Sequence, residues 1–175
     1  GLTRFFGRPA YGRISYGADI GNMTISLCSM SEVPTEDWVG LLNHPDVVRH
    51  MPLAAGNWTE DTAADWVRGK DAQWLKNGYG PWSIRIDGSF AGWGGFQMEE
   101  DGADLALVLL PEYWGQGPMI FRRFMSLRNK LGIGPVSIML PPSRRRFKGL
   151  ARLGFQFVGE LTYEGQHFLK FRTLE

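Results

Sequence analysis

Cysteine, histidine and long apolar runs are scarce in this 175-residue sequence. The single cysteine, Cys28, can form no internal disulfide and lies in an alternating, strand-like segment. This pattern favours a small buried side chain in a reducing, cytoplasmic setting. No apolar run approaches the ~20 residues that span a bilayer, which excludes a membrane-spanning helix. The three histidines show no metal-ligand spacing, so we expect no metal site.

Net charge is also low, at +1 for the whole chain, but the charges are unevenly distributed. Between Gly115 and Phe155 there are nine basic residues and no acidic residue, which suits a polyanionic partner. From Glu32 to Glu112 there are fourteen acidic and five basic residues, which suits a cationic partner. Solvated surfaces give similar runs of charge, so both interpretations stay open.

The length and the apolar content predict a single domain with one hydrophobic core. Residues 1–22 are rich in Gly, Arg and aromatic residues and lack the apolar core of a secretory signal. We therefore expect residues 1–22 to form an arm outside the fold and residues 23–175 to form the domain.

Hydrophobic patterns predict the elements of the first half of that domain. Residues 23–29 alternate and predict a strand. Residues 34–45 and 59–78 carry helix-start residues, acidic first turns and apolar residues at helical spacing, so they predict two helices. A hairpin follows, with Asp87-Gly88 in its tight turn, and an apolar run over residues 104–110 predicts a buried strand.

The second half of the domain predicts two more helices and three more strands. We expect helices over residues 120–131 and 143–153, a strand over residues 135–140, and a closing hairpin over residues 155–174. The hairpins imply antiparallel pairing, and the strand-helix-strand connections imply a parallel contribution. The expected fold is therefore a mixed α/β sheet.

The segment PEYWGQGPMI, residues 111–120, places Gly115 and Gly117 between an apolar strand and a helix. The start of a helix presents unpaired N–H groups and a partial positive charge, and glycines let the backbone approach a phosphate. A G-x-G pattern alone is common in simple turns. The flanking strand and helix favour a phosphate site, and so do the nine basic residues between Gly115 and Phe155, which we call the basic segment.

Together with ARLGFQFVGE downstream and LLNHPDVVRHMP upstream, this segment resembles the GNAT acyltransferase superfamily, and more narrowly the branch that acetylates protein N-termini, including those of ribosomal proteins. The resemblance covers nearly all of residues 23–175. It implies a single-domain, mostly antiparallel mixed sheet flanked by helices, with a splayed central strand pair that holds the pantetheine arm of coenzyme A. It also implies acetyl-CoA as the acyl donor and a primary amine, either a peptide N-terminus or a small amine, as the acceptor.

The resemblance assigns cofactor-binding residues to the glycine-containing segment and to the basic segment. They are Leu109 (through its main chain), Trp114, Gly115, Gln116, Gly117, Met119, Arg146 and Lys148. Met119 departs from the family pattern, which has a small residue there, and Pro118 has no N–H to donate. The family's Asn-x-x-Ser is represented by Ser143 and Arg146, and the tyrosine that many members use as an acid falls at Leu150.

Direct attack of an amine on a thioester requires a base for the amine proton and an N–H group for the developing oxyanion. Glu99 is the candidate base, either directly or through a water molecule. Glu100 and Glu112 are alternatives, and each is also an ordinary candidate for an exposed carboxylate.

The departing thiolate would be helped by an acid. Ser143 is the candidate acid, although it is also well suited to cap the helix that follows it. Tyr113 and Tyr163 are alternatives. The neighbouring cations of the basic segment could instead lower the proton affinity of the thiolate.

Two other functions stay open. The first is a GNAT-fold protein that binds an acyl-CoA and catalyses weakly or not at all. The second is a ribosome- or RNA-binding module, in which Arg4, Arg8 and Arg13 join the basic segment. Nucleic acid is the less favoured partner, because the sequence carries no aromatic RNA-binding strand motif. A homodimer formed through the N-terminal arm is also open.

Overall fold

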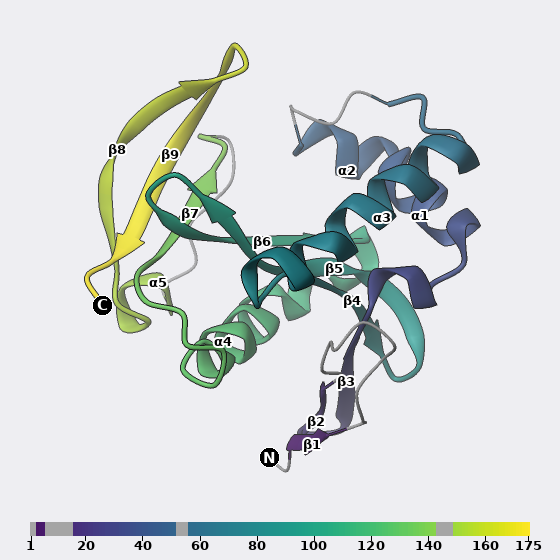
Figure 1. The fold of residues 1–175 in the computed structure, drawn as a ribbon, viewed down its shortest axis with the longest axis horizontal. Coiled ribbons are helices and arrows are strands. Elements are labelled where there is room, and N and C mark those ends of the chain that lie inside the picture. The colour runs from purple at the N-terminus through teal and green to yellow at the C-terminus, as the bar shows by residue number, and fades with distance from the viewer. Residues whose placement is uncertain (1–2, 6–15, 52–55, 143–148) are drawn as a thin grey trace.

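A computed structural model describes residues 3–5, 16–51, 56–142 and 149–175 (Figure 1). The strands of these residues form one nine-stranded sheet in the order β1-β2-β3-β4-β5-β6-β7-β9-β8. Neighbouring strands are antiparallel except β6 and β7, which are parallel. The mixed, mostly antiparallel α/β fold predicted from the sequence is confirmed.

The strands are β1 (Thr3–Phe5), β2 (Tyr16–Ile20), β3 (Met23–Cys28), β4 (Pro81–Ile86), β5 (Ser89–Glu99), β6 (Gly102–Leu109), β7 (Val136–Leu140), β8 (Phe155–Tyr163) and β9 (Gln166–Thr173). The α-helices are α1 (Thr35–Leu42), α2 (Pro45–Arg49), α3 (Glu60–Asn77), α4 (Gly117–Leu127) and α5 (Gly149–Arg152), and η1 (Met30–Glu32) and η2 (Pro111–Gln116) are 3-10 helices. None of the helices in the described ranges combines the length and apolar character needed to cross a membrane.

The first strands differ from the expectation of an arm outside the fold. β2 pairs with β3 from Tyr16 opposite Leu27 to Ile20 opposite Met23, and β1 pairs with β2. These residues therefore extend the edge of the sheet. No sequence pattern predicted this pairing, because an edge strand is held by backbone hydrogen bonds, which require no alternating apolar pattern.

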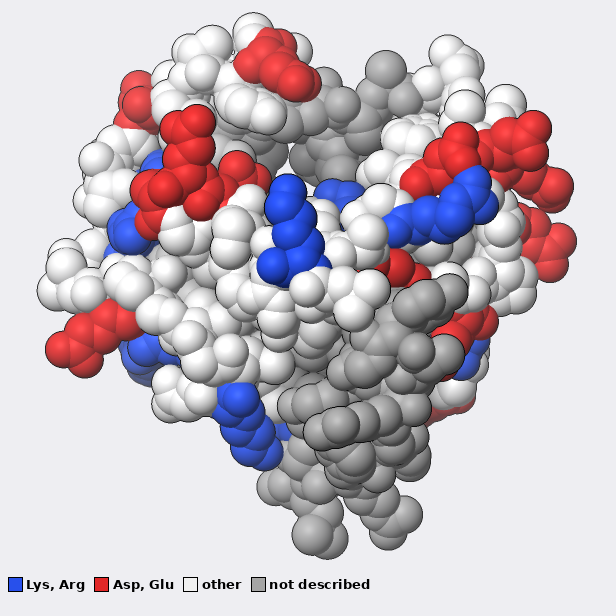
Figure 2. Space-filling model, in the orientation of Figure 1, with Lys and Arg blue, Asp and Glu red and all other residues white. Residues whose placement is uncertain are grey.

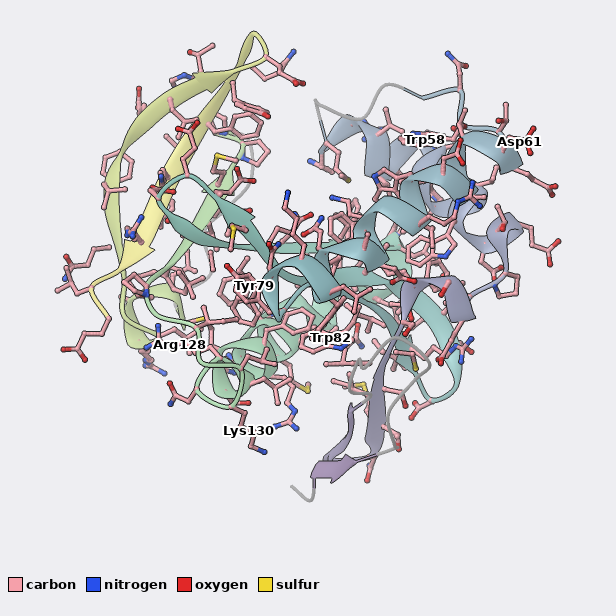
Figure 3. All side chains as sticks on the ribbon, in the orientation of Figure 1. Trp58, Asp61, Tyr79, Trp82, Arg128 and Lys130 are labelled. Carbon is pink, nitrogen blue, oxygen red and sulfur yellow. The ribbon has the colours of Figure 1, made fainter. Side chains whose placement is uncertain are left out.

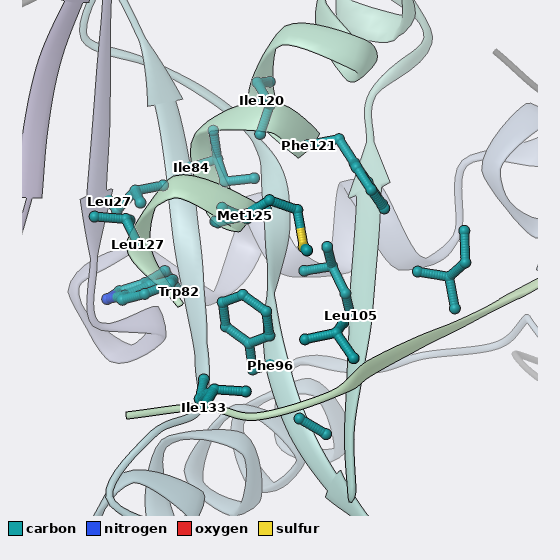
Figure 4. Close-up of a cluster of buried hydrophobic side chains, with 14 of the residues drawn as sticks. Leu27, Trp82, Ile84, Phe96, Leu105, Ile120, Phe121, Met125, Leu127 and Ile133 are labelled. Atoms are coloured by element: carbon teal, nitrogen blue, oxygen red, sulfur yellow. The ribbon is translucent and has the colours of Figure 1, made fainter. Parts of the chain in front are cut away.

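Two groups of helices cover the two faces of the sheet (Figure 1). α4 packs its buried residues, among them Phe121 and Phe124, on one face against Phe96 and Leu105 (Figure 4). α1, α2 and α3 pack on the other face, where Trp38 and Val67 form a second cluster with Trp93 of β5. The central strands are thus covered on both sides.

Local signals explain where α3 begins and ends. The Thr59 hydroxyl accepts a hydrogen bond from the Thr62 N–H, and Thr62 reciprocates, which forms a capping box. Gly78 ends the helix with a φ of 79°. The buried Asp71 carboxylate accepts hydrogen bonds from the N–H groups of Met30 (3.0 Å) and Ser31 (3.1 Å), so it ties α3 to η1.

The hairpin of β4 and β5 positions the strand that carries the candidate site. Its predicted turn is confirmed, since Asp87 and Gly88 have φ values of 50° and 82°. A bulge in β5 near Gly92 shifts the register, and the Ala91 carbonyl there accepts a hydrogen bond from the Leu110 N–H at 2.8 Å. This bond fixes the point at which the chain leaves β6.

Candidate active site

The parallel strands β6 and β7 separate along their length. They pair only at Ala103 with Val136 and Asp104 with Ser137. Beyond these residues β6 continues to pair with β5 on one side, up to Leu109, and β7 pairs with β9 on the other. The sheet therefore contains an opening that is closed at Asp104 and Ser137, which we call the apex, and that widens toward Leu109 and η2. This is the splay that the resemblance implied.

The wide end of the opening leads into η2 and the start of α4. Gly115 and Gly117 both lie here, at the end of a 3-10 helix and at the beginning of α4 respectively. Neither has a positive φ, and apart from the adjoining residues no atom of the described residues lies within 4 Å of the point where a Cβ of Gly115 would be. Backbone strain and packing therefore do not explain why residue 115 is a glycine, whereas the close approach of a ligand to the backbone would explain it.

Trp114 and Leu109 are bonded to each other at this end. The indole N–H of Trp114 donates to the Leu109 carbonyl at 2.8 Å, and the Trp114 ring makes a T-shaped contact with the ring of His50, which follows α2, at 5.3 Å between centroids. The Leu109 carbonyl keeps one further lone pair for a ligand. Trp114 therefore fixes the path of the chain between β6 and η2.

Two observations bear on the fit of a phosphate-bearing ligand at the wide end. The Gly117 N–H donates to the Trp114 carbonyl, and Pro118 has no N–H, so Met119 is the next residue that can present an N–H to an anion. The Gln116 Oε1 atom is buried and has no hydrogen-bond partner in the described ranges. An unpaired buried amide oxygen suits a ligand that carries a donor.

The other predicted residues of the basic segment fall outside the structure's described ranges. Ser143, Arg146 and Lys148 lie within residues 143–148, which are among the residues left undescribed. Earlier in the basic segment, Arg128 donates to the Thr173 hydroxyl at 3.3 Å and to the Glu175 carbonyl. Figure 3 shows Arg128 and Lys130 near the C-terminal end of α4. Arg128 is thus engaged with the end of the chain.

At the apex lies a carboxyl group that the sequence analysis missed. Asp104 is an isolated charge in the apolar run of β6, and burial is the first cause that raises the pKa of its carboxyl from 3.8 to about 7. The charges of Glu99 and Asp101 also raise this pKa, while Lys170 and Lys70 lower it. Asp104 therefore changes its protonation state near neutral pH.

Glu99, the predicted base, lies at the end of β5 near Asp104. It is exposed, and its electrostatic effect on Asp104 marks the two as neighbours. The turn beside it is held in place, because Asp101 forms ion pairs with Lys170 and, at 2.9 Å, with Arg172 of β9. These contacts join the β5–β6 turn to β9 across the end of β7.

A buried hydroxyl and a lysine complete the apex. Ser137, opposite Asp104, is 3% exposed, and its Oγ atom has no hydrogen-bond partner in the described part of the chain. Lys70 reaches the same face from α3 and donates to the Gln97 Oε1 atom at 2.5 Å. Gln97 pairs with Asp104 across the two strands, so their side chains share one face of the sheet.

The alternative candidates lie in three different settings. Glu112 is exposed on η2, and Tyr113 packs partly buried against the core. Tyr163 is 48% exposed at the end of β8. The described residues contain no group of three His, Cys, Asp or Glu side chains that could hold a metal ion.

Figure 2 shows a notch in the rim of the molecule, between the part formed by β8 and β9 and the part formed by α1 to α3. Basic side chains lie near its floor, and acidic side chains lie on both sides of it. Charged groups of both signs therefore border the hollow on this face.

Comparisons with known proteins agree with this geometry. Residues 30–121, more than half of the chain, match the acetyltransferase (GNAT) domain family, so the chain belongs to the GNAT acetyltransferase family. None of the curated proteins compared with the chain matches it.

Several solved structures have the same fold. A GnaT-family acetyltransferase from Bordetella pertussis has a TM-score of 0.71 and 16% identity, over 90% of this chain and 98% of that chain. An acetyltransferase from Salmonella typhimurium that modifies the N-terminal serine of the 50S ribosomal subunit protein L7/L12 has a TM-score of 0.68 and 16% identity, over 89% and 96%. The microcin C7 self-immunity acetyltransferase MccE, solved with acetyl-CoA and AMP, has a TM-score of 0.70 and 14% identity, over 89% and 94%. At such identities the likeness shows the fold alone.

Proposed function

We propose that the protein is an acetyl-CoA-dependent N-acetyltransferase that acts on a primary amine, either a peptide N-terminus or a small amine. One observation carries the proposal: the opening between β6 and β7 ends at Asp104, a carboxyl group with a pKa of about 7. A base works best when its pKa lies near the working pH. The solved relatives that modify a ribosomal N-terminus or bind acetyl-CoA support the same class of reaction.

Acetyl-CoA would supply the acetyl group as a thioester. The wide end would hold its phosphates through Gly115, Gln116, Gly117 and Met119, with Arg146 and Lys148 as cations and Trp114 as the support of the turn. The main chain at Leu109 would bind the pantetheine arm. The space that the described residues leave at Gly115 supports this assignment. The unpaired Gln116 Oε1 atom is an acceptor, so it suits an N–H or O–H group of the same ligand rather than a phosphate oxygen.

Asp104 would take the proton of the amine. Most primary amines are ammonium ions at neutral pH, so the base has to remove a proton before the amine can attack the thioester directly. Above a pH of about 7 Asp104 is ionised and can accept that proton. The exposed Glu99 would then pass the proton to solvent, because its position beside Asp104 suits a second carrier.

Two hydroxyl groups are candidates to assist the departing thiolate. Ser143 remains the prediction from the sequence. Ser137 is a second candidate, because its Oγ atom is buried at the apex and unpaired in the described ranges. A buried hydroxyl without a partner is unfavourable in the free protein, and a ligand atom that accepts its hydrogen bond would relieve this cost.

The test combines binding and turnover. Isothermal titration with acetyl-CoA, and with dephospho-CoA for comparison, should give micromolar binding that weakens when the 3′-phosphate is absent. Free thiol should then be released only when acetyl-CoA and an amine are both present. Tight binding without thiol release from a broad panel of peptides and small amines would indicate an acyl-CoA-binding protein, and no binding at millimolar acetyl-CoA would contradict the assignment of the wide end.

A further inference from the structure

The ammonium group of Lys70 is held in a defined position on the face of the sheet that carries Gln97 and Asp104. Its Nζ atom donates to Gln97 Oε1 at 2.5 Å, and Gln73 of the same helix donates to that oxygen at 3.3 Å. The Nζ atom also lies 4.8 Å from the ring centroid of Trp93 and 5.5 Å from that of Trp66. An amide and two indole rings thus restrict where this charge can lie.

Within the part of the chain that the structure describes, Lys70 lacks a counter-ion at close range. Among the described residues, no carboxylate oxygen lies within the 4.0 Å ion-pair distance of its Nζ atom. Burial lowers the pKa of Lys70, and the more distant charges of Glu99 and Asp104 raise it. The ammonium group has therefore lost part of its hydration without gaining a carboxylate, and an anionic ligand would restore what it lost.

Asp104 at the apex and Lys70 of α3 have opposite charges, and Gln97 is a neighbour of both. Gln97, which accepts from Lys70, stands opposite Asp104 in the β5–β6 register. Side chains opposite each other in an antiparallel pair have Cβ atoms about 5 Å apart. Lys70 and Asp104 are therefore both neighbours of the Gln97 side chain on one face of the sheet, where one small molecule could meet both charges.

We propose that Lys70 binds a carboxylate of the acceptor, so that the acceptor is an amine with a carboxylate close to the reacting nitrogen. Asp104 faces the amine and Lys70 faces the carboxylate. Two sources have this chemistry: a free amino acid, through its α-carboxylate, and a peptide with an acidic residue next to its N-terminus. The inference rests on the proposed function, because it assigns the acceptor of the same site.

Two matched pairs of acceptors test the inference. Alanine and alaninamide differ in the free α-carboxylate, which also raises the pKa of the alanine amine, so the rates of this pair are compared per free amine. The peptide amides Ala-Asp-NH2 and Ala-Asn-NH2 differ only in the side-chain carboxylate. For each pair, the ratio of kcat/KM between the two members is measured with acetyl-CoA at one pH. The ratio cancels any change in the base itself, including the change that the loss of a positive charge at Lys70 makes to Asp104.

Three variants separate a binding role from a structural one. We expect the wild type to prefer the carboxylate member of at least one pair by about tenfold or more, as expected for one charge-assisted hydrogen bond. K70Q should reduce that preference to less than about threefold, and K70R should retain most of it. K76Q removes an exposed lysine from the last turn of the same helix and should leave the ratio unchanged.

The results that overturn the inference differ from those that overturn the proposed function. Turnover of both members of both pairs at equal rates, or an unchanged preference in K70Q, contradicts the role of Lys70 and leaves the acetyltransferase intact. Titration of Ala-Asp-NH2 and alanine into the wild type and K70Q gives a second readout that needs no turnover. Binding of one of them that K70Q weakens supports the carboxylate site even if no acetyl transfer occurs. The absence of both turnover and Lys70-dependent binding contradicts the carboxylate site, and the acetyltransferase proposal falls only if the broad panel of amines also releases no thiol.

Discussion

The two ends of the opening between β6 and β7 are built from different chemistry. The wide end presents glycines, a proline and a main-chain carbonyl around η2, whereas the apex presents Asp104, Ser137 and, across Gln97, Lys70. A site made of backbone depends on shape and on the space that glycines leave. A site made of charged side chains depends on protonation and desolvation. The proposed donor and acceptor sites should therefore respond to different kinds of mutation.

The same contrast appears between two glycines. A Cβ at Gly92 would lie 2.0 Å from the Val108 carbonyl oxygen, and its φ is 149°, so packing within the sheet requires glycine there. A Cβ at Gly115 would meet none of the residues that the structure describes, apart from its chain neighbours. Gly92 is thus required by the packing of the sheet, whereas Gly115 leaves space that a ligand could occupy.

The largest effect is expected at the apex. D104N removes the proposed base, and kcat/KM should fall by about 100-fold or more while acetyl-CoA affinity changes less than threefold. Steady-state thiol release and isothermal titration measure the two quantities. D37N, on the exposed start of α1, is the matched control and should behave as wild type. A D104N enzyme that keeps a third of its activity would show that another group is the base.

G92A should destabilise the fold strongly. The added Cβ collides with β6 backbone and the φ is unfavourable for alanine, so we expect the free energy of unfolding to fall by about 3 kcal/mol. G115A is the control and should change it by less than about 0.5 kcal/mol. Chemical denaturation measures both, and equal losses in the two variants would remove the distinction between the two glycines.

The stability of D104N should depend on pH in a direction set by the raised pKa. The folded protein keeps the Asp104 proton up to a pH of about 7, whereas the unfolded chain loses it near 3.8. Raising the pH between these values therefore destabilises the wild type, but has no such effect on asparagine. The advantage of D104N should grow as the pH rises from 4 to about 7, by on the order of 4 kcal/mol for this shift, and then level off. A constant difference across this range would contradict the raised pKa.

G115L should weaken the binding of acetyl-CoA without unfolding the protein. Its side chain would enter the space that the proposal gives to a phosphate, and acetyl-CoA affinity should fall about tenfold. The melting temperature and the pH dependence of turnover should stay as in the wild type. Unchanged affinity would show that the ligand does not approach Gly115.

The smallest effect is expected at Glu99. E99Q removes a negative charge that raises the pKa of Asp104, so the midpoint of the pH dependence of kcat/KM should move to lower pH by less than one unit. Turnover above pH 8 should change less than about threefold. A loss as large as that of D104N would make Glu99 the base, as the sequence suggested.

Much of the fold could be predicted because its signals are local. Thr59 and Gly78 mark the ends of α3, and Asp87-Gly88 marks a hairpin turn, since each depends on a few neighbouring residues. The edge strands β1 and β2 were missed because pairing at an edge leaves no side-chain pattern. The predicted roles of Glu99, Ser143 and the glycine-containing segment remain predictions.

In the candidate site, too, some residues could be predicted from local sequence and others could not. The glycine-containing segment was visible because one short stretch carries all of it, and Asp104 could have been noticed as the only charge in an apolar strand. Lys70 and Ser137 carried no such signal, because a lysine on a helix and a serine in a strand are ordinary residues. Their importance comes from burial and from neighbours distant in the sequence.

The sequence by itself determined the order of most elements after residue 22, the hairpin turns and the place of a candidate phosphate site, because caps, turns and hydrophobic periods act over a few residues. Only the tertiary structure decided that β6 and β7 separate after Asp104 and that Lys70 and Asp104 both lie beside Gln97 on one face of the sheet. It also decided that the pKa of the Asp104 carboxyl is about 7. The register of the sheet and the loss of water around a charge depend on the whole fold, and no local pattern of residues encodes them.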